Sequence, residues 1–160
     1  MAKKKYIWII GTLLIVGALF FSFSESRVNG YAILNGFGGD ITIYKDTSCG
    51  CCTIYGNYFK SKGNSNTKVI TTGDVDSIKT KYRVPKALES CHTTIIGDYF
   101  VEGHIPLEAV EKLLKEKPDI KGLAMPGMPE GSPGMMGSKR GDFVIYAVDY
   151  DGGYKEFMRL

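Results

Sequence analysis

Three of the four cysteines in this 160-residue chain lie within four consecutive positions, as Cys49, Cys51 and Cys52. The β-branched and aromatic run over residues 41–44 predicts a strand before them, and apolar residues at helical spacing predict a helix over residues 52–62. The cluster is therefore expected where a strand turns into a helix. A helix N-terminus stabilises thiolates, which favours both thiol exchange and metal binding.

The spacing of these cysteines argues against a scaffold of structural disulfides. Adjacent and next-but-one cysteines bridge each other only with strained geometry, so two stable disulfides cannot easily be drawn. Cys49 and Cys52 form a C-x-x-C pair, but Cys51 is a third thiol inserted between them. The pattern therefore indicates metal binding or redox chemistry.

The elements predicted after the cluster follow the order of a thioredoxin-like unit. They are a strand over residues 67–72, a short helix over 74–82, a hairpin over 94–102 and an amphipathic helix over 106–117. With the first strand and helix, this order predicts an α/β protein of the thioredoxin-like type.

The C-terminal part is expected to be an addition to that unit. Residues 119–141 are rich in glycine and proline and predict a long loop, and long loops in compact domains tend to be functional. Residues 143–148 and 154–158 then predict a closing β-hairpin.

The N-terminus predicts a membrane anchor. Lysines at positions 3–5 precede an uncharged apolar run over residues 7–23, which at ~17 residues is near the lower limit for a transmembrane helix. The lysines place the N-terminus inside, so the rest of the chain is expected on the periplasmic or other extracytoplasmic side of the inner membrane. A cleavable signal peptide is the alternative. The expected organisation is an anchor over 1–23, a linker over 24–39 and a folded domain over 40–160.

One cysteine and two histidines are candidate ligands from a distant part of the chain. Cys91 lies just before the third predicted strand, and in thioredoxin-like folds that loop faces the C-x-x-C helix. We therefore expect Cys91 to converge with the cluster, although a lone cysteine can also be a small buried hydrophobe. His92 and His104 are expected near the same end, either as ligands or as solvated turn residues.

The glycine- and proline-rich loop carries four methionines, Met125, Met128, Met135 and Met136. Methionine is usually core filler, but this loop offers no regular face from which to pack, so a thioether ligand or metal-relay role is expected. Thiolates and thioethers together favour copper(I) over harder ions. An ordinary zinc ribbon uses two separated pairs of ligands, whereas several copper(I) ions bridged by shared thiolates accommodate crowded cysteines. The residues therefore predict a multinuclear copper(I) site.

Four motifs in this order resemble the CopG-type copper-resistance proteins, which are small periplasmic proteins with a thioredoxin-like fold. The motifs are CGCC at 49–52, SCHT at 90–93, VEGHIP at 101–106 and a GLAMPGMP run that ends in GSPGM over 122–135. The resemblance covers about residues 41–148 and implies that the four cysteines hold a multinuclear copper cluster in a protein of envelope copper tolerance. Cu(I)/Cu(II) oxidoreductase activity, and envelope copper-export or copper-oxidase components as partners, are further implications.

Two other classes of function stay open on the residues alone. A thiol-disulfide oxidoreductase would use Cys49 as nucleophile and Cys52 as resolving thiol, but Cys51 and Cys91 would then be superfluous. An anchored partner-binding domain would use the cysteines only as staples. The small formal net charge of +3, with no basic stripe, argues against a nucleic-acid partner.

Overall fold

The computed structural model describes residues 30–160, and residues 31–160 form one compact unit. The expected membrane segment over residues 7–23 lies outside this described part. Within it, none of the helices has the length and apolar character needed to span a bilayer.

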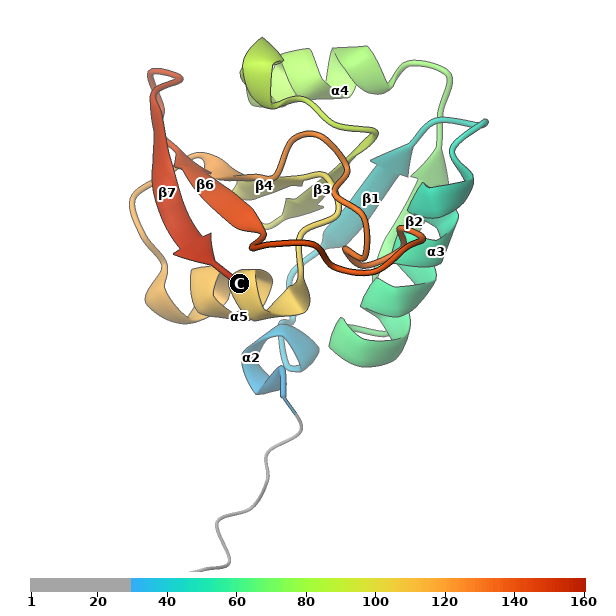
Figure 1. Cartoon of the computed structure of the whole chain (residues 1–160). Helices are drawn as coiled ribbons and strands as arrows, with labels where there is room; N and C mark the ends of the chain where they lie inside the picture. The colour runs from blue at the N-terminus through green and yellow to red at the C-terminus, as the bar shows by residue number, and fades with distance from the viewer. Residues whose placement is uncertain (1–29) are drawn as a thin grey trace, which may run out of the picture. The chain divides into compact units, whose positions relative to one another are not determined.

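The described residues form a mixed seven-stranded sheet in the order β2-β1-β3-β4-β5-β6-β7 (Figure 1). The strands are β1 (Ile41–Lys45), β2 (Lys68–Thr71), β3 (His92–Ile96), β4 (Tyr99–Glu102), β5 (Gly122–Ala124), β6 (Val144–Val148) and β7 (Tyr154–Arg159). β1 pairs with β2 and β4 with β5 in parallel, and the other neighbours are antiparallel. The chain is therefore an α/β protein, as the sequence predicts.

Helices cover both faces of this sheet. They are α2 (Ala32–Asn35), α3 (Gly50–Tyr58) with its π-helical continuation η1 (Phe59–Gly63), α4 (Val75–Tyr82), the 3-10 helix η2 (Lys86–Leu88) and α5 (Leu107–Glu116). Ile43, Tyr55 and Leu113 belong to one buried cluster, which places α3 and α5 on the same face. Ile95 and Leu88 belong to a second cluster on the opposite face, beside α4. Alternation along the strands separates the two clusters, since successive side chains point to opposite faces.

The first turns of the helices follow from their capping residues. Asp74 accepts a hydrogen bond from the amide of Ser77 at 3.0 Å and so caps α4. Pro106 lies at the N-cap of α5, where its missing N–H costs nothing. α3 begins at Gly50, with Cys49 at its N-cap.

The folded unit begins earlier than the sequence predicts, because the end of the expected linker over 24–39 is structured. Residues 32–35 form α2, whose Leu34 is fully buried against α5. The Glu111 carboxylate accepts hydrogen bonds from the amides of Ile33 and Leu34 at 2.9 and 2.8 Å. A four-residue helix is unstable alone, so burial and these two bonds stabilise it.

The expected loop over 119–141 also contains a strand, β5, which joins the C-terminal hairpin to the sheet. Gly122 begins it, and a Cβ there would lie 2.2 Å from the carbonyl oxygen of Phe100, so a side chain would prevent the pairing. Three residues are too few to show an alternating pattern, which is why the sequence did not predict this strand. The irregular segment is limited to residues 125–143.

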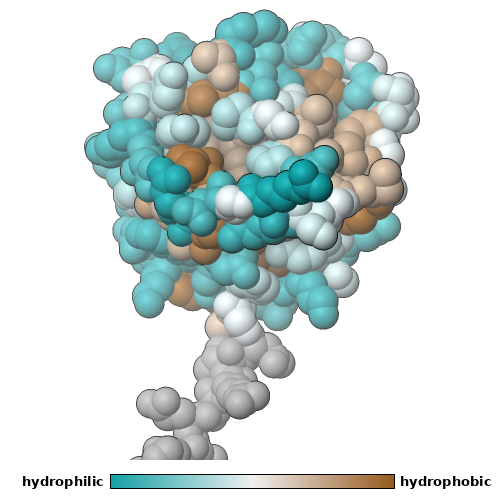
Figure 2. Space-filling model, in the orientation of Figure 1, coloured by the Kyte–Doolittle hydropathy of each residue, from teal (hydrophilic) through white to brown (hydrophobic). Residues whose placement is uncertain are grey.

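Exposed hydrophobic side chains are scattered over the surface. Figure 2 shows small brown patches among teal hydrophilic residues on one side of the molecule. Ile54 on α3 and Met128 and Met136 in the loop are exposed by 55, 42 and 86%. Isolated apolar residues are normal at protein surfaces, so these do not by themselves mark an interface.

Candidate metal centre

The turn from β1 into α3 brings three cysteine sulfurs together. Asp46 accepts a hydrogen bond from the amide of Ser48 at 2.9 Å, which shapes the turn. Cys49 Sγ accepts from the amide of Cys52 at 3.2 Å and thereby caps α3. Cys51 Sγ lies 3.5 Å from Cys49 Sγ. The sulfurs therefore gather at a helix N-terminus, where a thiolate is electrostatically favoured.

Cys91, immediately before β3, reaches the same place from the sheet. Its carbonyl oxygen lies 3.6 Å from Cys52 Sγ. Its own Sγ lies 3.4 Å from Nδ1 of His92 and 3.1 Å from Nε2 of His104. The structure thus places Cys91 and both histidines beside the cysteine cluster.

Two overlapping groups of donor atoms result among the described residues. In each group, one donor atom from every member lies within 4.8 Å of all the others. The sulfur group is Cys49, Cys51, Cys52 and Cys91, and the mixed group is Cys52, Cys91, His92 and His104. Cys52 and Cys91 belong to both, so the two groups form one continuous site.

Strand alternation explains why His92 faces the cysteines and Thr93 does not. The His92 ring lies 4.5 Å from the Tyr55 ring of α3, measured between centroids. Thr93 points to the other face, where its hydroxyl donates to Glu102 at 2.6 Å. Consecutive residues of β3 therefore face two different clusters of polar side chains: His92 faces the cysteines, and Thr93 faces Glu102.

A buried ion pair, Lys79 with Glu102, lies on the face of the sheet opposite the cysteines and contacts the segment that carries Cys91. The Lys79 ammonium bonds to the Glu102 carboxylate and donates to the Thr93 hydroxyl at 3.1 Å, and both charged side chains are almost completely buried. Besides Lys79 and the Thr93 hydroxyl, the amide of Ser90 donates a hydrogen bond to the Glu102 carboxylate at 2.6 Å. Burial raises the pKa of the Glu102 carboxyl, against the opposing effect of Lys79. Removing either Lys79 or Glu102 would leave an uncompensated buried charge, so the pair is expected to stay together. Because the Ser90 amide donates to this pair, we expect the pair to hold Ser90 and the adjacent Cys91 in place.

Both histidines are neutral and suited to bind a metal ion. Burial lowers the pKa of His92 well below its usual range and also lowers the pKa of His104. His104 Nδ1 lies 2.7 Å from the carbonyl oxygen of Pro133, and a carbonyl can only accept, so the ring proton is on Nδ1. Its Nε2 lone pair therefore faces Cys91. The Nε2 atom of His92 has no hydrogen-bond partner among the described residues.

The Cys91 thiol is not an activated nucleophile. Burial, with a smaller contribution from Cys51, raises the pKa of Cys91 to about 11. Without a metal ion it is therefore protonated at neutral pH and poorly reactive. A coordinating metal ion would displace that proton.

A disulfide joins Cys49 and Cys52, while Cys51 and Cys91 are free thiols in the described part of the chain. The Cα atoms of the bonded pair are 5.4 Å apart, within the usual range of about 4.4 to 6.8 Å. The C-x-x-C spacing of Cys49 and Cys52 allows this one disulfide, whereas the closeness of Cys51 to both of them disfavours a second disulfide within the cluster. A site of four thiolates therefore requires that the Cys49–Cys52 bond be reduced, since only the thiolate is a strong metal ligand.

The methionines of the loop are in different environments. Met125 is 1% exposed and belongs to the main hydrophobic cluster, so the expectation that it lacks a packing face was wrong. β5 leads the chain directly into the core at that point. Met135 is partly buried, and Met128 and Met136 are exposed.

The loop covers the site through backbone contacts that the sequence did not predict. Gly134, with φ of +85°, lies so close to α3 that a Cβ would be 2.9 Å from the carbonyl oxygen of Cys51 and 2.8 Å from the amide nitrogen of Tyr55. Together with the hydrogen bond between Pro133 and His104, this contact places residues 133–135 over the metal centre. Backbone contacts of this kind leave no side-chain signal, except that Gly134 must be glycine.

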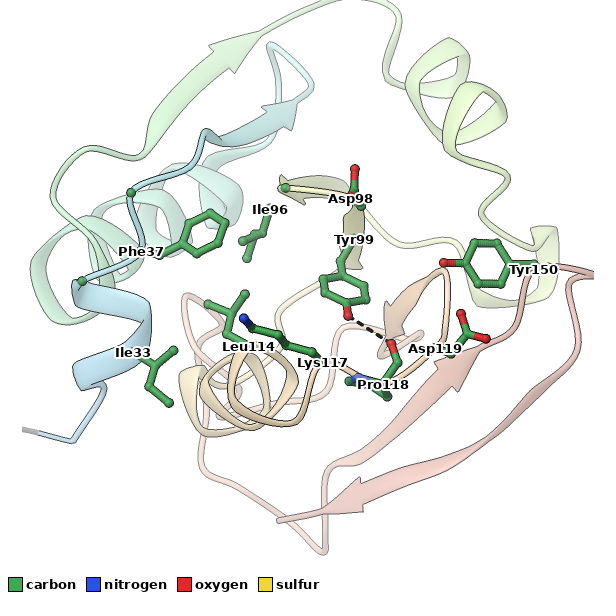
Figure 3. Close-up of a pocket in the computed structure, with 13 residues that line it drawn as sticks. Ile33, Phe37, Ile96, Asp98, Tyr99, Leu114, Lys117, Pro118, Asp119 and Tyr150 are labelled. Atoms are coloured by element: carbon green, nitrogen blue, oxygen red, sulfur yellow. Dashed lines mark hydrogen bonds between the residues drawn. The ribbon is translucent and has the colours of Figure 1, made fainter.

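A pocket of about 640 Å³ lies elsewhere, at the opposite end of β3 from His92 (Figure 3). Ile96 and Tyr99 line it, and the Tyr99 hydroxyl donates to the carbonyl oxygen of Pro118 at 3.0 Å. No cysteine, histidine or methionine of the described residues is in its lining. The metal centre and this pocket are therefore separate features.

Fold and site together define an α/β protein in which a partly buried cluster of cysteines and histidines that could hold a metal ion lies under a glycine- and proline-rich loop. Residues 88–135, which include Cys91 and both histidines, match a family described as "Protein of unknown function, DUF411". A solved structure of copper resistance protein CopG, form 2, is 32% identical with a TM-score of 0.70, and covers 76% of this chain and 98% of its own. A second, form 1, is 33% identical with a TM-score of 0.66, and covers 76% of this chain and 96% of its own. No match was found among the curated proteins. The chain belongs to the CopG family of copper-resistance proteins.

Proposed function

We propose that the protein binds copper(I) outside the cytoplasm, in copper tolerance and homeostasis. The observation that carries this proposal is the convergence of four sulfurs and two neutral imidazoles, in a chain whose solved relatives are named copper-resistance proteins. Soft sulfur ligands select copper(I) over harder ions. In the reduced protein, Cys49, Cys51, Cys52 and Cys91 would bridge several ions, with His92 and His104 as supporting ligands.

The loop would act as a lid and delivery strand. Met135 follows the Pro133–Gly134 contact directly, and Met128 and Met136 offer exposed thioethers to an arriving ion. Met125 is left out of this role because it packs in the core. Envelope copper-export or copper-oxidase components are the proposed partners.

Cu(I)/Cu(II) redox activity is part of the same proposal. Oxidation of the Cys49 and Cys52 thiols to the disulfide releases two electrons and two protons, which suffice to reduce two copper(II) ions to copper(I). The structure supports this because the disulfide lies within the donor group that would hold the ions.

We also propose a thioredoxin-like classification for the unit from β1 to α5. β1 lies between β2 and β3, parallel to the first and antiparallel to the second, and β4 completes a hairpin with β3. This arrangement supports the element order predicted from the sequence.

Residues 1–23 are proposed to anchor the chain in the inner membrane with its domain in the periplasm. The support is the lysine triplet before the apolar run. A reporter fused after Leu160 should be active only outside the cytoplasm. Cytoplasmic activity of the fusion would overturn the location and, with it, the envelope role.

The central test is copper stoichiometry of the full-length reduced protein, reconstituted anaerobically with copper(I). We expect more than one copper ion per chain and retention against a moderate copper(I) chelator. Failure to bind copper(I), or preferential binding of a single zinc ion, would contradict the proposal.

A second function, thiol-disulfide exchange, is favoured by one observation, the Cys49–Cys52 disulfide itself. Exchange would need Cys49 and Cys52 but not Cys91, whereas copper binding needs all three. Cys91→Ser therefore separates the two functions: a reductase assay on a protein disulfide would be unaffected, while copper binding would be lost.

A further inference from the structure

The pocket at the opposite end of β3 from the metal centre has the size of a site for a small molecule. Its volume of about 640 Å³ lies within the range of about 300 to 1,000 Å³ that is usual for ligand sites. Its wall is formed by α2 with the loop after it, the β3–β4 turn, the end of α5 and the turn between β6 and β7. Segments from distant parts of the chain therefore meet around one cavity.

The side chains of the pocket divide into an apolar group and a group that is acidic and aromatic. Figure 3 shows the two groups on either side of the Tyr99 ring, with Ile33, Phe37, Ile96 and Leu114 on one side and Tyr150 and Asp119 on the other. Ile33 and Tyr150 are exposed by 39 and 58%. Because both line the same cavity, they are not isolated surface residues, and a ligand with an apolar body would cover them.

Charged groups of both signs line the pocket without pairing with one another. The Lys117 ammonium and the carboxylates of Asp98 and Asp119 are exposed, and in the described part of the chain none of them forms an ion pair or a side-chain hydrogen bond. Burial, followed by the nearby Tyr150, Asp98 and Asp119, raises the pKa of Tyr99. Both carboxylates therefore lie close enough to act on the hydroxyl in the middle of the pocket.

Hydrogen bonds hold the wall of the pocket in place before any ligand arrives. The buried Asn64 donates from Nδ2 to the carbonyl oxygens of Leu34 and Phe37 at 2.8 and 3.1 Å. The Tyr99 hydroxyl donates to the carbonyl oxygen of Pro118 at 3.0 Å. A wall that is already ordered lowers the entropy cost of binding.

We propose that this pocket binds a small zwitterion with an apolar body, which is the chemistry of a free α-amino acid with an apolar or aromatic side chain. The carboxylate of the ligand pairs with the Lys117 ammonium. Its ammonium pairs with Asp98 and Asp119 beside the Tyr150 ring, whose face also attracts a cation. Its side chain packs on the Phe37 side of the pocket. The site uses no residue of the metal centre, so the inference goes beyond the copper function and does not depend on it.

A ligand with a single charge fits this pocket less well. A cation would satisfy the two carboxylates but lie near the Lys117 ammonium, and an anion would pair with Lys117 but lie near the carboxylates. Like charges brought together at a binding site lower affinity. Because the three charged groups are exposed, each pairing should change affinity by about threefold rather than by orders of magnitude.

The test uses isothermal titration calorimetry of the full-length chain in detergent, with protein-free micelles as the blank. The probes are L-phenylalanine and two analogues that each lack one charge: phenethylamine has no carboxylate, and 3-phenylpropionate has no ammonium. We expect phenylalanine to bind about threefold or more tightly than either analogue. Equal binding of all three probes, or no binding of phenylalanine, overturns the inference.

Two variants identify which residues recognise which charge. Lys117→Gln should lower the affinity for phenylalanine about threefold without lowering that for phenethylamine. The double variant Asp98→Asn and Asp119→Asn should weaken the binding of phenylalanine but not that of 3-phenylpropionate. Asp76→Asn, which removes a carboxylate from α4 outside the pocket, is the matched control and should change neither.

The thermal unfolding midpoints of these variants should match that of the wild type, because each replaces only exposed side chains. A loss of affinity that is the same for every probe, whatever its charge, overturns the inference. The result is independent of the metal centre, since failure to bind copper(I) would contradict the proposed function and leave this site as it is.

Discussion

The two halves of the candidate metal centre differ in their burial and in the contacts that hold them. Cys49 and Cys51 lie in a turn at a helix N-terminus, partly exposed, and Cys49 is able to form a disulfide. His92 and His104 are fully buried, and Cys91 is partly buried beside them. The sheet, the Glu102 network and the Pro133 carbonyl hold these three residues. The cysteines at the start of α3 can therefore change between thiol and disulfide, while Cys91 and the histidines are held by the surrounding residues.

The largest expected effect comes from removing one sulfur from either half of the site, and it is a loss of copper(I) stoichiometry. Cys91→Ser should reduce copper binding as severely as Cys49→Ser, with loss of most of the bound metal, because both sulfurs belong to one donor group. Metal analysis of anaerobically reconstituted variants provides the measurement. Near-normal stoichiometry in Cys91→Ser would make a single shared site untenable.

A smaller effect is expected from disturbing the loop over the site. Gly134→Ala introduces a Cβ within 2.9 Å of the α3 backbone, whereas Gly127→Ala, with almost the same φ of +84°, meets no atom within 4 Å. Both variants carry backbone strain of about 1 to 2 kcal/mol. The clash should add about 1 to 3 kcal/mol to Gly134→Ala alone.

Denaturant unfolding and the rate of copper(I) transfer to a chelator check this prediction. Gly134→Ala should unfold more easily and release copper faster than the matched Gly127→Ala. Equal behaviour of the two alanine variants would show that the loop does not press on α3.

The buried His92 should make the free energy of unfolding of the metal-free protein fall in acid. The unfolded chain protonates His92 near its ordinary pKa of about 6.5, but burial lowers the folded-state pKa well below that value. The stabilisation is therefore complete above about pH 6.5 and is lost as the pH falls, by up to about 1.4 kcal/mol per pH unit for one histidine.

Urea unfolding of the reduced, metal-free protein between about pH 7.5 and 5.5 measures this slope. His92→Asn, which does not titrate, should unfold at lower urea overall but lose this part of the slope. A wild-type stability that is flat over this interval would contradict the buried, neutral state of His92.

The smallest effect is expected from the methionines. Replacing Met128, Met135 and Met136 by leucine keeps the apolar volume and removes the sulfurs, so the free energy of unfolding should change by less than about 1.5 kcal/mol. Copper(I) should nevertheless pass to a chelator faster. Met125→Leu, a core substitution, is the matched control and should leave release unchanged. Identical release from the triple variant and wild type would falsify the relay role.

The predictable parts of the fold are those with a strong local pattern. The β-branched run at Ile41, the capping Asp74 and the amphipathic spacing of α5 each identify an element within a few residues of its observed bounds. α2 and β5 were not predicted because four and three residues show no period, and because tertiary contacts stabilise them.

The candidate site also has features that the sequence predicts and features that it does not. The proximity of Cys91 to the cysteine cluster could be expected from the order of the elements. The role of Lys79 could not, since a lysine on an amphipathic helix reads as exposed, and only the distant Glu102 makes its burial tolerable. The contact of Pro133 with His104 could not be predicted either, because it uses a backbone carbonyl.

The capping of α3 by a cysteine sulfur has a consequence for how the protein can be observed. Amides in the first turn of a helix lack partners within the helix, and here the amide of Cys52 is satisfied by Cys49 Sγ. Whatever occupies or oxidises that sulfur alters how often the first turn opens to solvent. Deuterium uptake at residues 50–53 should therefore follow loading and reduction of the centre, and would record both without a spectroscopically active metal.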